Sequence, residues 1–371
     1  MKSPGHWQDF GKYLACLFFL TAMSPLLLFL DGYHRVSRLT PASSVSFPDM
    51  LPQPPPRLTW PNTPMPVLPK GSQIHKPLLI LLWGWPFLSA EECSPGLGRP
   101  DQCRLTTNRS QYAAADAVLM YHRDVSGSPL LLPRAPRPPS QLWIWFNMDP
   151  PSSSRNLASM DGLFNLTMTY RRDSDIFTPY GWLRVLKNPQ RFTIPPKSKL
   201  VALVSSKWPL GSRQGKYYRQ IQRYFPVDVY RLPQTGLSSR ELQLTLSHYK
   251  FYLAFENSVH EDYITEKLWK NALLAGAVPV VLGPPRENYE RYLPPEAFVH
   301  VDDFPTVREL ARFLGKLARD PVRYQRYFQW RTWLEPVLET SWTARLCRAC
   351  RVLRETSDTF RATPRLSQWF K

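Results

Sequence analysis

The sequence is short of acidic side chains: its 371 residues include 29 Asp and Glu against 47 Lys and Arg, a formal net charge of +18. This imbalance excludes a surface designed to attract cations and favours an anionic partner, whether nucleic acid, a membrane or a phosphorylated small molecule. The basic residues are dispersed and no nucleic-acid-binding motif accompanies them, so nucleic acid is not expected as a partner. The sequence also lacks a P-loop and a G-x-G-x-x-G loop, which excludes these two ways of cradling phosphate.

What the sequence does contain is enough apolar material for a folded body. Apolar residues make up 43% of the chain and aromatic residues 13%, so a sizeable core can form and wholesale disorder is excluded. The length allows two domains of ordinary size, or one domain with attachments.

The N-terminal region predicts a membrane anchor. The run Tyr13–Leu30 has 18 residues and no charged side chain, and as a helix it would be roughly 27 Å long, enough to cross a thin bilayer. A removable signal peptide is the alternative, but no small-x-small cleavage pattern follows the run. Two N-x-S/T sequons, at Asn108 and Asn165, favour a lumenal position for the rest of the chain and thus a short cytoplasmic tail.

A stiff stem is expected between the anchor and the body. Ten of the 39 prolines lie between Pro41 and Pro69, and the near absence of apolar periodicity there is typical of an extended spacer that cannot bury a core. A proline-recognition motif is the less favoured alternative. The expected organisation is a tail (1–12), an anchor (13–30), a stem (31–73) and two body domains (74–195 and 196–371).

The body alternates strands with helices, most clearly beyond about Tyr249. Apolar runs bounded by turn residues predict buried strands. Strand–helix–strand alternation indicates an α/β fold with parallel sheets covered by helices, and two such halves imply a cleft between them. The expected strands are 78–83, 117–121, 142–146, 199–205, 250–255, 278–282 and 298–301, and the expected helices are 265–275, closed by Gly276, 289–292 and 306–318.

The cysteines favour disulfides. Cys16 lies in the expected anchor, and the four cysteines of the body are Cys93, Cys103, Cys347 and Cys350. Cys347 and Cys350 have the spacing of half a zinc site, but no matching C-x-x-C or His cluster accompanies them. In an oxidising compartment two disulfides are favoured, and the sequence alone permits three pairings.

The most specific stretch runs from Phe255 to Trp269 and reads FENSVHEDYITEKLW. A strand ends there, a polar loop follows and a helix begins near Thr265, so free backbone N–H groups and the positive end of the helix dipole form an anion site. Lys267 in the first turn adds a full charge, which suits a pyrophosphate at the usual ligand crevice of an α/β sheet. The alternatives are that Lys267 is a solvated surface lysine and that Glu266 only complements the helix dipole.

A second candidate site follows the apolar strand WIWF. This strand ends at Asn147-Met148-Asp149 because two prolines come next. A carboxylate at a strand end beside aromatic bulk can act as a general base on a sugar hydroxyl, which makes Asp149 a candidate. An acid before Pro-Pro is also a common turn residue, and that reading stays open from the residues alone.

Asp173 and Asp175 form a D-x-D pair that is similar to the divalent-metal motif of one large class of glycosyltransferases. Two acids at this spacing often occur by chance, and here they follow Arg171 and Arg172. Pairing with those arginines is therefore the favoured reading over metal ligation.

Three motifs together resemble one known family. They are FNLTMTYRRDSDIFTPYGWL (164–183), FEN…DYITEKLW (255–269) and VPVVLGPPRENYERYLPPEAFVHVDDF (278–304). By these motifs the chain is similar to the Lewis-type α1,3/4-fucosyltransferases, the tenth glycosyltransferase family, over essentially all of Ile74 to Lys371. The resemblance implies a GT-B fold, with two Rossmann-like domains facing across a cleft, in a single-pass type II enzyme of the Golgi cisterna membrane with a lumenal body.

The resemblance also implies a reaction and its residues. L-fucose would pass from GDP-β-L-fucose, bound by domain 196–371, to GlcNAc on the acceptor side, domain 74–195, with inversion at the fucose carbon. Asp149 would be the catalytic base that inversion requires, and Glu266 would lie near the fucose. No metal would be required, with manganese stimulation left open, so Asp173 and Asp175 are demoted as ligands. The implied donor-binding residues are Asn257, Tyr263, Glu266, Lys267 and Arg213, and the implied disulfides are Cys93–Cys347 and Cys103–Cys350, which would return the C-terminal tail to the first domain.

The sequence departs from the family pattern at three places. Asp149 stands where the family usually has Glu, and the missing methylene could displace the carboxylate by about 1 Å. The donor-binding arginine of the family falls on Gln214, with Arg213 one place earlier. The acceptor-specificity motif His-His-Trp/Arg-Asp reads Tyr-His122-Arg123-Asp124, and arginine at its third place resembles the members that prefer type 2 chains and form α1,3 links.

We therefore expect a Golgi α1,3-fucosyltransferase that acts on type 2 lactosamine glycans of glycoproteins and glycolipids and makes Lewis x-type or sialyl Lewis x-type products. Two alternatives remain. One is a metal-dependent transferase that uses Asp173 and Asp175, and the other is a membrane-anchored glycan-binding protein with a weak catalytic site.

Overall fold

The computed structural model describes residues 77–84, 103–205, 211–231, 236–355 and 365–371. The expected anchor with Cys16, the proline-rich stem and Cys93 lie outside these residues. Within the described ranges, no helix combines the length and the apolar character that crossing a membrane requires.

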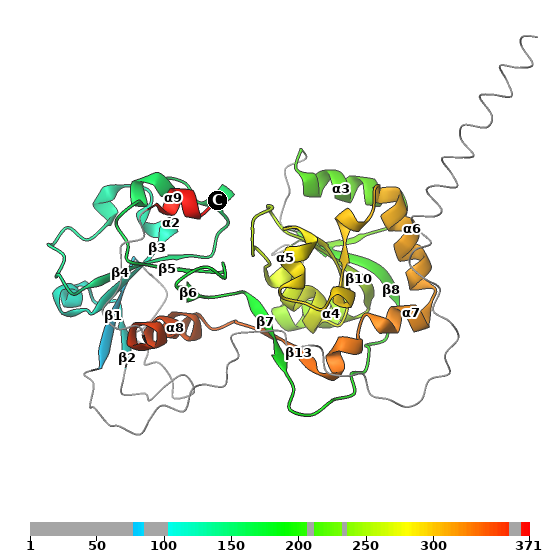
Figure 1. The fold of residues 1–371 in the computed structure, drawn as a ribbon. Coiled ribbons are helices and arrows are strands. Elements are labelled where there is room, and N and C mark those ends of the chain that lie inside the picture. Colours follow the sequence, from blue (N-terminus) through cyan, green and yellow to red (C-terminus); the bar gives the residue numbers. More distant parts are fainter. Residues whose placement is uncertain (1–76, 85–102, 206–210, 232–235, 356–364) are drawn as a thin grey trace, which may run out of the picture. The chain divides into compact units, whose positions relative to one another are not determined.

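Six parallel strands form the first sheet, in the order β2-β1-β3-β4-β5-β6 (Figure 1). Strands β1, β3 and β4 are almost unbroken apolar runs, because a parallel sheet is covered on both faces. Ile80, Ile144 and Trp145 are fully buried in it. The strands are Leu78–Trp83 (β1), Cys103–Thr106 (β2), Ala117–Tyr121 (β3), Leu142–Asn147 (β4), Leu166–Thr169 (β5) and Ile176–Phe177 (β6).

Five parallel strands form the second sheet, in the order β12-β11-β10-β8-β9. Alternate residues of its central strand enter two different cores: Phe251, Leu253 and Phe255 pack on one side of the sheet, and Tyr252 and Ala254 on the other. The strands are Lys199–Val204 (β8), Asp228–Tyr230 (β9), Tyr249–Phe255 (β10), Val278–Leu282 (β11) and Val299–His300 (β12).

The strand order reverses once in each sheet. In the first sheet β1 lies between β2 and β3, and in the second β8 lies between β9 and β10. Where the order reverses, successive connections leave the sheet in opposite directions, and a crevice opens beyond the carboxyl ends of the strands. These two switch points are therefore the expected places for ligands.

Helices cover the sheets and connect the strands. Apolar residues of α6 pack on one side of the second sheet, and those of α4 and η7 on the other. The helices of six or more residues are Arg213–Ile221 (α3), Ser239–Ser247 (α4), Lys267–Leu274 (η7), Val307–Ala318 (α6), Pro321–Arg326 (α7), Trp342–Glu355 (α8) and Arg109–Ala114 (η3). The shorter ones are His122–Val125 (α2), Pro129–Leu131 (η4), Pro151–Ser153 (η5), Leu157–Met160 (η6), Arg286–Glu290 (α5), Pro295–Ala297 (η8), Val301–Asp303 (η9), Gln329–Thr332 (η10) and Leu366–Trp369 (α9).

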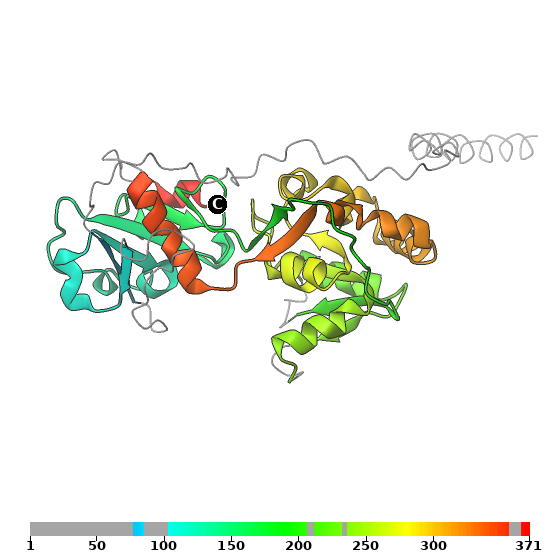
Figure 2. The ribbon, with the colours of Figure 1, turned by 90° about the horizontal axis from the view of Figure 1, so that it is seen from below.

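The C-terminal segment returns to the first sheet. Strand β13 (Leu334–Leu338) first pairs antiparallel with β7 (Gly181–Val185). Helices α8 and α9, orange to red in Figures 1 and 2, then pack with the core of the first sheet through Leu346, Leu366 and Phe370. Cys103 of β2 is disulfide-bonded to Cys350 of α8, the pairing that the family resemblance implies.

Cys347 is also disulfide-bonded. Its expected partner, Cys93, lies outside the described residues.

The expected α/β fold with parallel sheets is confirmed, and so are most strands predicted from apolar runs. The strands expected at 78–83, 117–121 and 278–282 have the expected bounds, and the other expected elements differ at one or both ends. The larger differences are that the helix expected from Thr265 begins at Lys267 and that the short helix expected at 289–292 is α5, Arg286–Glu290. The antiparallel pair β7–β13 is a feature that the strand–helix alternation does not predict.

Candidate active site

Two groups of polar residues lie beyond the carboxyl ends of strands, one group in each sheet. Asp149 comes two residues after β4, and Glu256 and Asn257 follow β10 directly. In the first sheet, β4 is separated from β1, where the strand order reverses, by β3 alone. In the second sheet, β10 lies directly beside β8, where the order reverses. The fold therefore places two candidate groups at the edges where α/β sheets keep their chemistry.

Asp149 is held by neighbours on β3 and α2. Its Oδ2 accepts a hydrogen bond of 3.0 Å from the Tyr121 hydroxyl. Nη2 of Arg123 donates to Oδ1 at 3.0 Å and to Oδ2 at 2.8 Å, and the backbone N–H of Asp149 donates to Asn147 Oδ1 at 3.1 Å. The Asp149 side chain is 27% exposed and that of Arg123 is 68% exposed. An ion pair this exposed contributes no more than about 1 kcal/mol, so an incoming hydroxyl can displace the arginine at small cost.

Tyr121 acts as a hydrogen-bond donor to Asp149. Burial raises the pKa of its hydroxyl, and the charge and hydrogen bond of Asp149 raise it further. The hydroxyl therefore keeps its proton at neutral pH and donates a hydrogen bond to the carboxylate. Tyr121 occupies the first place of the acceptor-specificity motif, where the family usually has His, and its contact with Asp149 was not expected from the sequence.

The other two residues of that motif point elsewhere. His122 is buried; its Nε2 donates to the Arg155 carbonyl at 2.8 Å and its Nδ1 accepts from the Trp145 indole at 3.2 Å. Burial lowers the pKa of His122, so the ring is a neutral core residue with one fixed tautomer. Asp124 lines a cavity together with Trp83. Of the three motif residues expected to set acceptor specificity, only Arg123 reaches Asp149.

A buried ion pair forms the second group. Glu256 is fully buried, and its Oε2 accepts from Lys267 Nζ at 3.2 Å; the Lys267 side chain is 12% exposed. Thr265 donates to the same carboxylate through its backbone N–H and its hydroxyl, both at 2.8 Å. Burial raises the pKa of Glu256, and the charge of Lys267 opposes that effect. The pair fixes the lysine ammonium at the start of η7.

Glu256 is a residue to which sequence reasoning gave no role. The available signal was its place directly after five buried apolar residues of β10 and before the polar loop. A carboxylate in such a position needs a cationic partner, and Lys267 is the cation that follows.

Helix η7 begins two residues later than the sequence predicts. The backbone N–H and the hydroxyl of Thr265 both donate to Glu256, so the regular turns start at Lys267. These turns have π-helical hydrogen bonding, which is frequent at functional sites. Glu266 stands at the N-terminal boundary of the helix with its side chain exposed, and the Asn257 side chain is also exposed. Gly276, with φ of +72°, ends the helix as predicted.

Tyr263 lies in an aromatic cluster. Its ring is buried, with its centroid 5.2 Å from that of Tyr170 and 6.2 Å from that of Tyr180. The Tyr180 hydroxyl donates to the Met148 carbonyl at 2.6 Å, one residue before Asp149. The cluster therefore joins the loop of one candidate group to that of the other.

Arg213 and Gln214 open helix α3. The Arg213 guanidinium is ion-paired with Asp302, which follows β12, whereas the Gln214 side chain is buried. Arg213 thus places a cation at the carboxyl edge of the second sheet. In the sequence it comes one residue before Gln214, the position of the family arginine. The preceding residues, 206–210, lie outside the described part of the chain.

Asp262 joins two loops and an α-helix. Its Oδ2 accepts the backbone N–H of Arg172 at 2.9 Å, and its Oδ1 accepts from the Asn288 side chain at 2.7 Å. Its own N–H donates to Asn288 Oδ1 at 2.8 Å. Asp262 has φ of +59°, a backbone conformation that costs a non-glycine residue roughly 1 kcal/mol or more and persists only where contacts enforce it. These hydrogen bonds fix the loop between Asn257 and Thr265.

The two acids of the D-x-D pair, Asp173 and Asp175, each have hydrogen-bond partners within the first sheet and the C-terminal segment. Both oxygens of Asp173 accept from Arg171, at 2.8 and 2.6 Å, and one also accepts from the Trp369 indole at 2.8 Å. Asp175 accepts from the N–H and the hydroxyl of Thr167, both at 2.7 Å. The two carboxylates thus have separate partners, and the described residues contain no group of three or more His, Cys, Asp or Glu arranged to hold a metal ion.

The two sequons differ in exposure. Asn108 is exposed and caps η3 by accepting the N–H of Ser110 at 3.0 Å. Asn165 is half-buried, and its Oδ1 accepts the N–H of Trp143 at 2.9 Å and a hydrogen bond from Arg137. The second sequon therefore also helps to join β4 to the start of β5.

Two family descriptions match the chain. "Glycosyltransferase family 10 (fucosyltransferase) C-term" matches residues 194–369, and "Fucosyltransferase, N-terminal" matches residues 75–181. Together they cover both sheets and both candidate groups.

Curated relatives match over most of their length. The chain is 49% identical over 309 residues to the 3-galactosyl-N-acetylglucosaminide 4-alpha-L-fucosyltransferase FUT3 of Bos taurus, covering 81% of this chain and 84% of the relative. It is 48% identical over 307 residues to the 4-galactosyl-N-acetylglucosaminide 3-alpha-L-fucosyltransferase FUT6 of Homo sapiens, covering 81% and 85%.

Among solved structures, the fold is similar to the crystal structure of an alpha1,3-fucosyltransferase with GDP. The TM-score is 0.51 at 16% sequence identity, and the match covers 79% of this chain and 95% of the other. At this identity the likeness establishes the shared fold, which is the GT-B arrangement. With both halves matched by the family and relatives near 50% identity, the chain belongs to glycosyltransferase family 10, the fucosyltransferases.

Proposed function

We propose that this fucosyltransferase transfers L-fucose from GDP-β-L-fucose to the 3-hydroxyl of GlcNAc in type 2 lactosamine glycans, with inversion at the fucose carbon. The acceptors are glycans of glycoproteins and glycolipids, and the products are of the Lewis x and sialyl Lewis x type. The observation that carries the proposal is the position of Asp149, held by Tyr121 and Arg123 at the carboxyl end of β4. It supplies the one base that an inverting transfer requires.

The donor is placed at the second sheet. Lys267 stands at the start of η7, where its ammonium and the helix N–H groups suit a diphosphate. Because Glu256 is buried behind it, the lysine is held in one position, and a positioned cation is more effective than a mobile one. Arg213 is a further cation that can bind the diphosphate once its ion pair with Asp302 opens. Asn257, Glu266 and Tyr263 complete the proposed donor site.

Asp149 acts as the base. As the fucose carbon takes on oxocarbenium-like character, the acceptor hydroxyl attacks it and its proton passes to Asp149. Tyr121 donates to one oxygen of Asp149, which leaves lone pairs on both oxygens for the incoming proton. The departing diphosphate is stabilised by Lys267.

Arg123 is the proposed selector of the acceptor. It is the exposed cation in direct contact with the base, so an acceptor sugar must pass it or displace it. Arginine at this place favours type 2 chains and the α1,3 linkage. The names of the relatives include a 3-alpha- and a 4-alpha-fucosyltransferase. The proposed preference for the α1,3 linkage therefore rests on Arg123 and not on the relatives.

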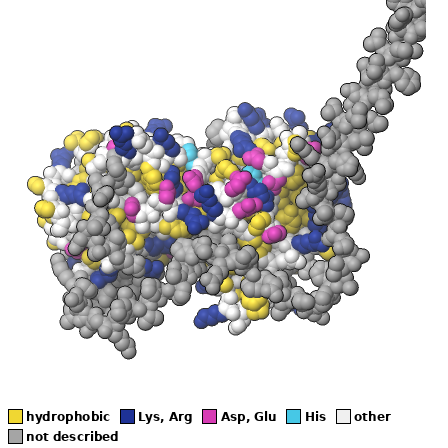
Figure 3. All heavy atoms as spheres, in the orientation of Figure 1, with side chains coloured by type: hydrophobic (Ala, Val, Ile, Leu, Met, Phe, Trp, Pro, Cys, Tyr) yellow, Lys and Arg dark blue, Asp and Glu magenta, His cyan; other side chains and the backbone are white. Residues whose placement is uncertain are grey.

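The proposed setting is the Golgi cisterna membrane, with a single-pass type II anchor at 13–30 and a lumenal body. The disulfide Cys103–Cys350 supports an oxidising compartment. Lys and Arg side chains on the face shown in Figure 3 are spread among acidic and neutral ones rather than gathered in one patch, which supports a small anionic substrate over nucleic acid.

The test incubates the full chain, in membranes of cells that lack other fucosyltransferases, with GDP-fucose and matched type 1 and type 2 acceptors. We expect the type 2 product to dominate, with an α1,3 linkage by NMR, and EDTA to leave the rate unchanged. A dominant α1,4 product contradicts the linkage assignment. Loss of activity in EDTA favours the metal-dependent alternative that uses Asp173 and Asp175, and binding of GDP or glycan without turnover favours a glycan-binding protein.

A further inference from the structure

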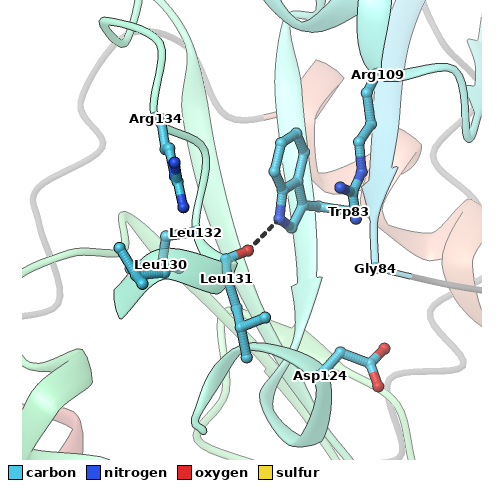
Figure 4. Close-up of a pocket in the computed structure, with 8 residues that line it drawn as sticks. All are labelled: Trp83, Gly84, Arg109, Asp124, Leu130, Leu131, Leu132 and Arg134. Atoms are coloured by element: carbon cyan, nitrogen blue, oxygen red, sulfur yellow. Dashed lines mark hydrogen bonds between the residues drawn. The ribbon is translucent and has the colours of Figure 1, made fainter. Parts of the chain in front are cut away.

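A cavity of about 430 Å³ lies at the switch point of the first sheet (Figure 4). Asp149 is not among the residues that line it. We call it the switch-point pocket. Its wall comes from the carboxyl end of β1, from η3, from α2 and from the segment after α2. The residues used below are Trp83, Gly84, Arg109, Asp124, Leu131 and Arg134.

Two cationic side chains, Arg109 and Arg134, line the pocket. Within the described part of the chain, neither Arg109 nor Arg134 has a carboxylate within ion-pair distance. In the view of Figure 4 their guanidinium groups flank the indole of Trp83, and Arg109 lies over that ring at 4.3 Å from its centroid. Arginine stays charged at all physiological pH values, and its planar group matches a carboxylate or a sulfate.

The rest of the pocket suits a sugar rather than a simple anion. Asp124 adds a carboxylate, and its buried Oδ2 has no hydrogen-bond donor among the described residues. A carboxylate repels a bare phosphate, but it accepts hydrogen bonds from the hydroxyls of a sugar. Leu131, 46% exposed, offers an apolar surface, and its carbonyl fixes the indole of Trp83 through a hydrogen bond of 2.6 Å.

Gly84 allows this close packing. Its φ is +85°, and a Cβ there would lie 3.1 Å from the Cβ of Asp124. At this distance a larger residue would require the Asp124 side chain to shift. Glycine is also the residue that adopts this φ readily.

The pocket is connected to the candidate base through α2. This single turn directs Arg123 to Asp149 and the next side chain, Asp124, into the pocket. Asp149 follows β4 and the pocket starts at β1, with only β3 between them, a separation of about 10 Å along the sheet edge at ~4.8 Å per strand. An acceptor of several sugars can span this distance while its GlcNAc stays at Asp149.

From this arrangement we propose that the switch-point pocket binds an acidic sugar of the acceptor glycan, one that carries a carboxylate or a sulfate. Arg109 and Arg134 bind the acidic group, Asp124 accepts from the sugar hydroxyls, and the leucine surface covers the apolar face. The inference rests on the proposed function and makes it specific: the enzyme favours acidic over neutral extensions of the same acceptor.

The test measures kcat/KM of the full chain for three acceptors built on one type 2 core: neutral, sialylated and sulfated. The readout is the ratio of the acidic to the neutral value for wild type, R109Q, R134Q and the double variant. Arg104 of β2, exposed and outside the pocket, provides the matched control R104Q. We expect the double variant to lower the ratio about tenfold or more and R104Q to leave it unchanged.

The outcomes separate this inference from the proposed function. A drop confined to the sialylated acceptor assigns the pocket to carboxylates, and a drop confined to the sulfated one assigns it to sulfates. The inference that the switch-point pocket binds an acidic sugar is wrong if the double variant leaves the ratio unchanged, or if wild type uses only the neutral acceptor. If wild type uses none of the three acceptors, the proposed function itself fails.

Discussion

Replacing Lys267 with Met should destabilise the protein strongly, because it removes the cation that is ion-paired with Glu256 among the described residues. Glu256 is fully buried, so its carboxylate would remain out of water with two hydrogen bonds from Thr265 and no counter-charge. Breaking a buried pair from one side typically costs about 3–5 kcal/mol. Removing both charges together leaves no buried ion, so the double variant E256Q/K267M should come within about 1 kcal/mol of wild type.

The loss should depend on pH. Burial already raises the pKa of Glu256 above its ordinary value of 4.5, and Lys267 opposes that effect. Without the lysine the folded-state pKa rises further, so the folded protein holds a proton that the unfolded chain releases. Folding is then most favourable below the unfolded-state pKa and weakens as pH rises through the folded one. K267M should therefore lose the most stability toward neutral pH and the least near pH 4.5.

The assay is urea unfolding of the full chain, read by proteolysis at several pH values, with fucosyl transfer measured on the same samples. The expected pattern is an unstable K267M, a restored E256Q/K267M, and no restoration of activity in either, because both lack the cation proposed for the diphosphate. If K267M unfolds at the same urea concentration as wild type across this pH range, or if the double variant is no more stable than K267M, the buried-pair reasoning is wrong.

Two further predictions concern the same half of the chain. G283A should destabilise the protein by about 1–3 kcal/mol in thermal unfolding, because a Cβ there would overlap the Tyr289 hydroxyl. The control is G315A, in the interior of α6, where a Cβ would have nothing within 4 Å; it should stabilise the protein by about 1 kcal/mol. Equal effects of the two substitutions would refute the packing argument. Burial lowers the pKa of Lys197 from 10.5 to about 8, so wild type should gain stability against urea as pH rises above 8, since the unfolded chain still binds the proton there, and K197M should lack that gain. A neutral amine still has N–H donors for the Ser247 and Gly276 carbonyls that Lys197 binds, and parallel pH curves for both proteins would contradict the assignment.

The parallel sheets could be predicted because their strands are buried on both faces. Runs such as Ala117–Tyr121 and Val278–Leu282 are apolar without interruption, and the structure has strands with those bounds. β5 is harder to recognise, since its sequence Leu-Thr-Met-Thr alternates apolar with polar residues, yet all four are buried. Its threonines are satisfied by contacts such as that of Thr167 with Asp175, which no local pattern reveals.

Of the candidate site, the positions of Asp149 and Lys267 could be predicted and their partners could not. Prolines after an apolar strand, and a lysine after a strand–loop–helix transition, are local signals. That Tyr121 donates to Asp149 depends on the pairing of β3 with β4, and that Glu256 lies under Lys267 depends on how η7 packs on the second sheet. His122 was expected near the acceptor and is a core residue, because its ring bridges Trp145 and the Arg155 carbonyl.

The central claim is that Asp149 removes the proton from the acceptor hydroxyl. The most direct test compares fucosyl transfer to a type 2 acceptor by D149N, D149E and the control E335Q, which alters a surface carboxylate also paired with an exposed arginine, Arg184. We expect kcat to fall about 100-fold or more in D149N, to be retained in large part in D149E, whose carboxylate is the one usual in the family, and to be unchanged in E335Q. Turnover of D149N at the wild-type rate would contradict the account.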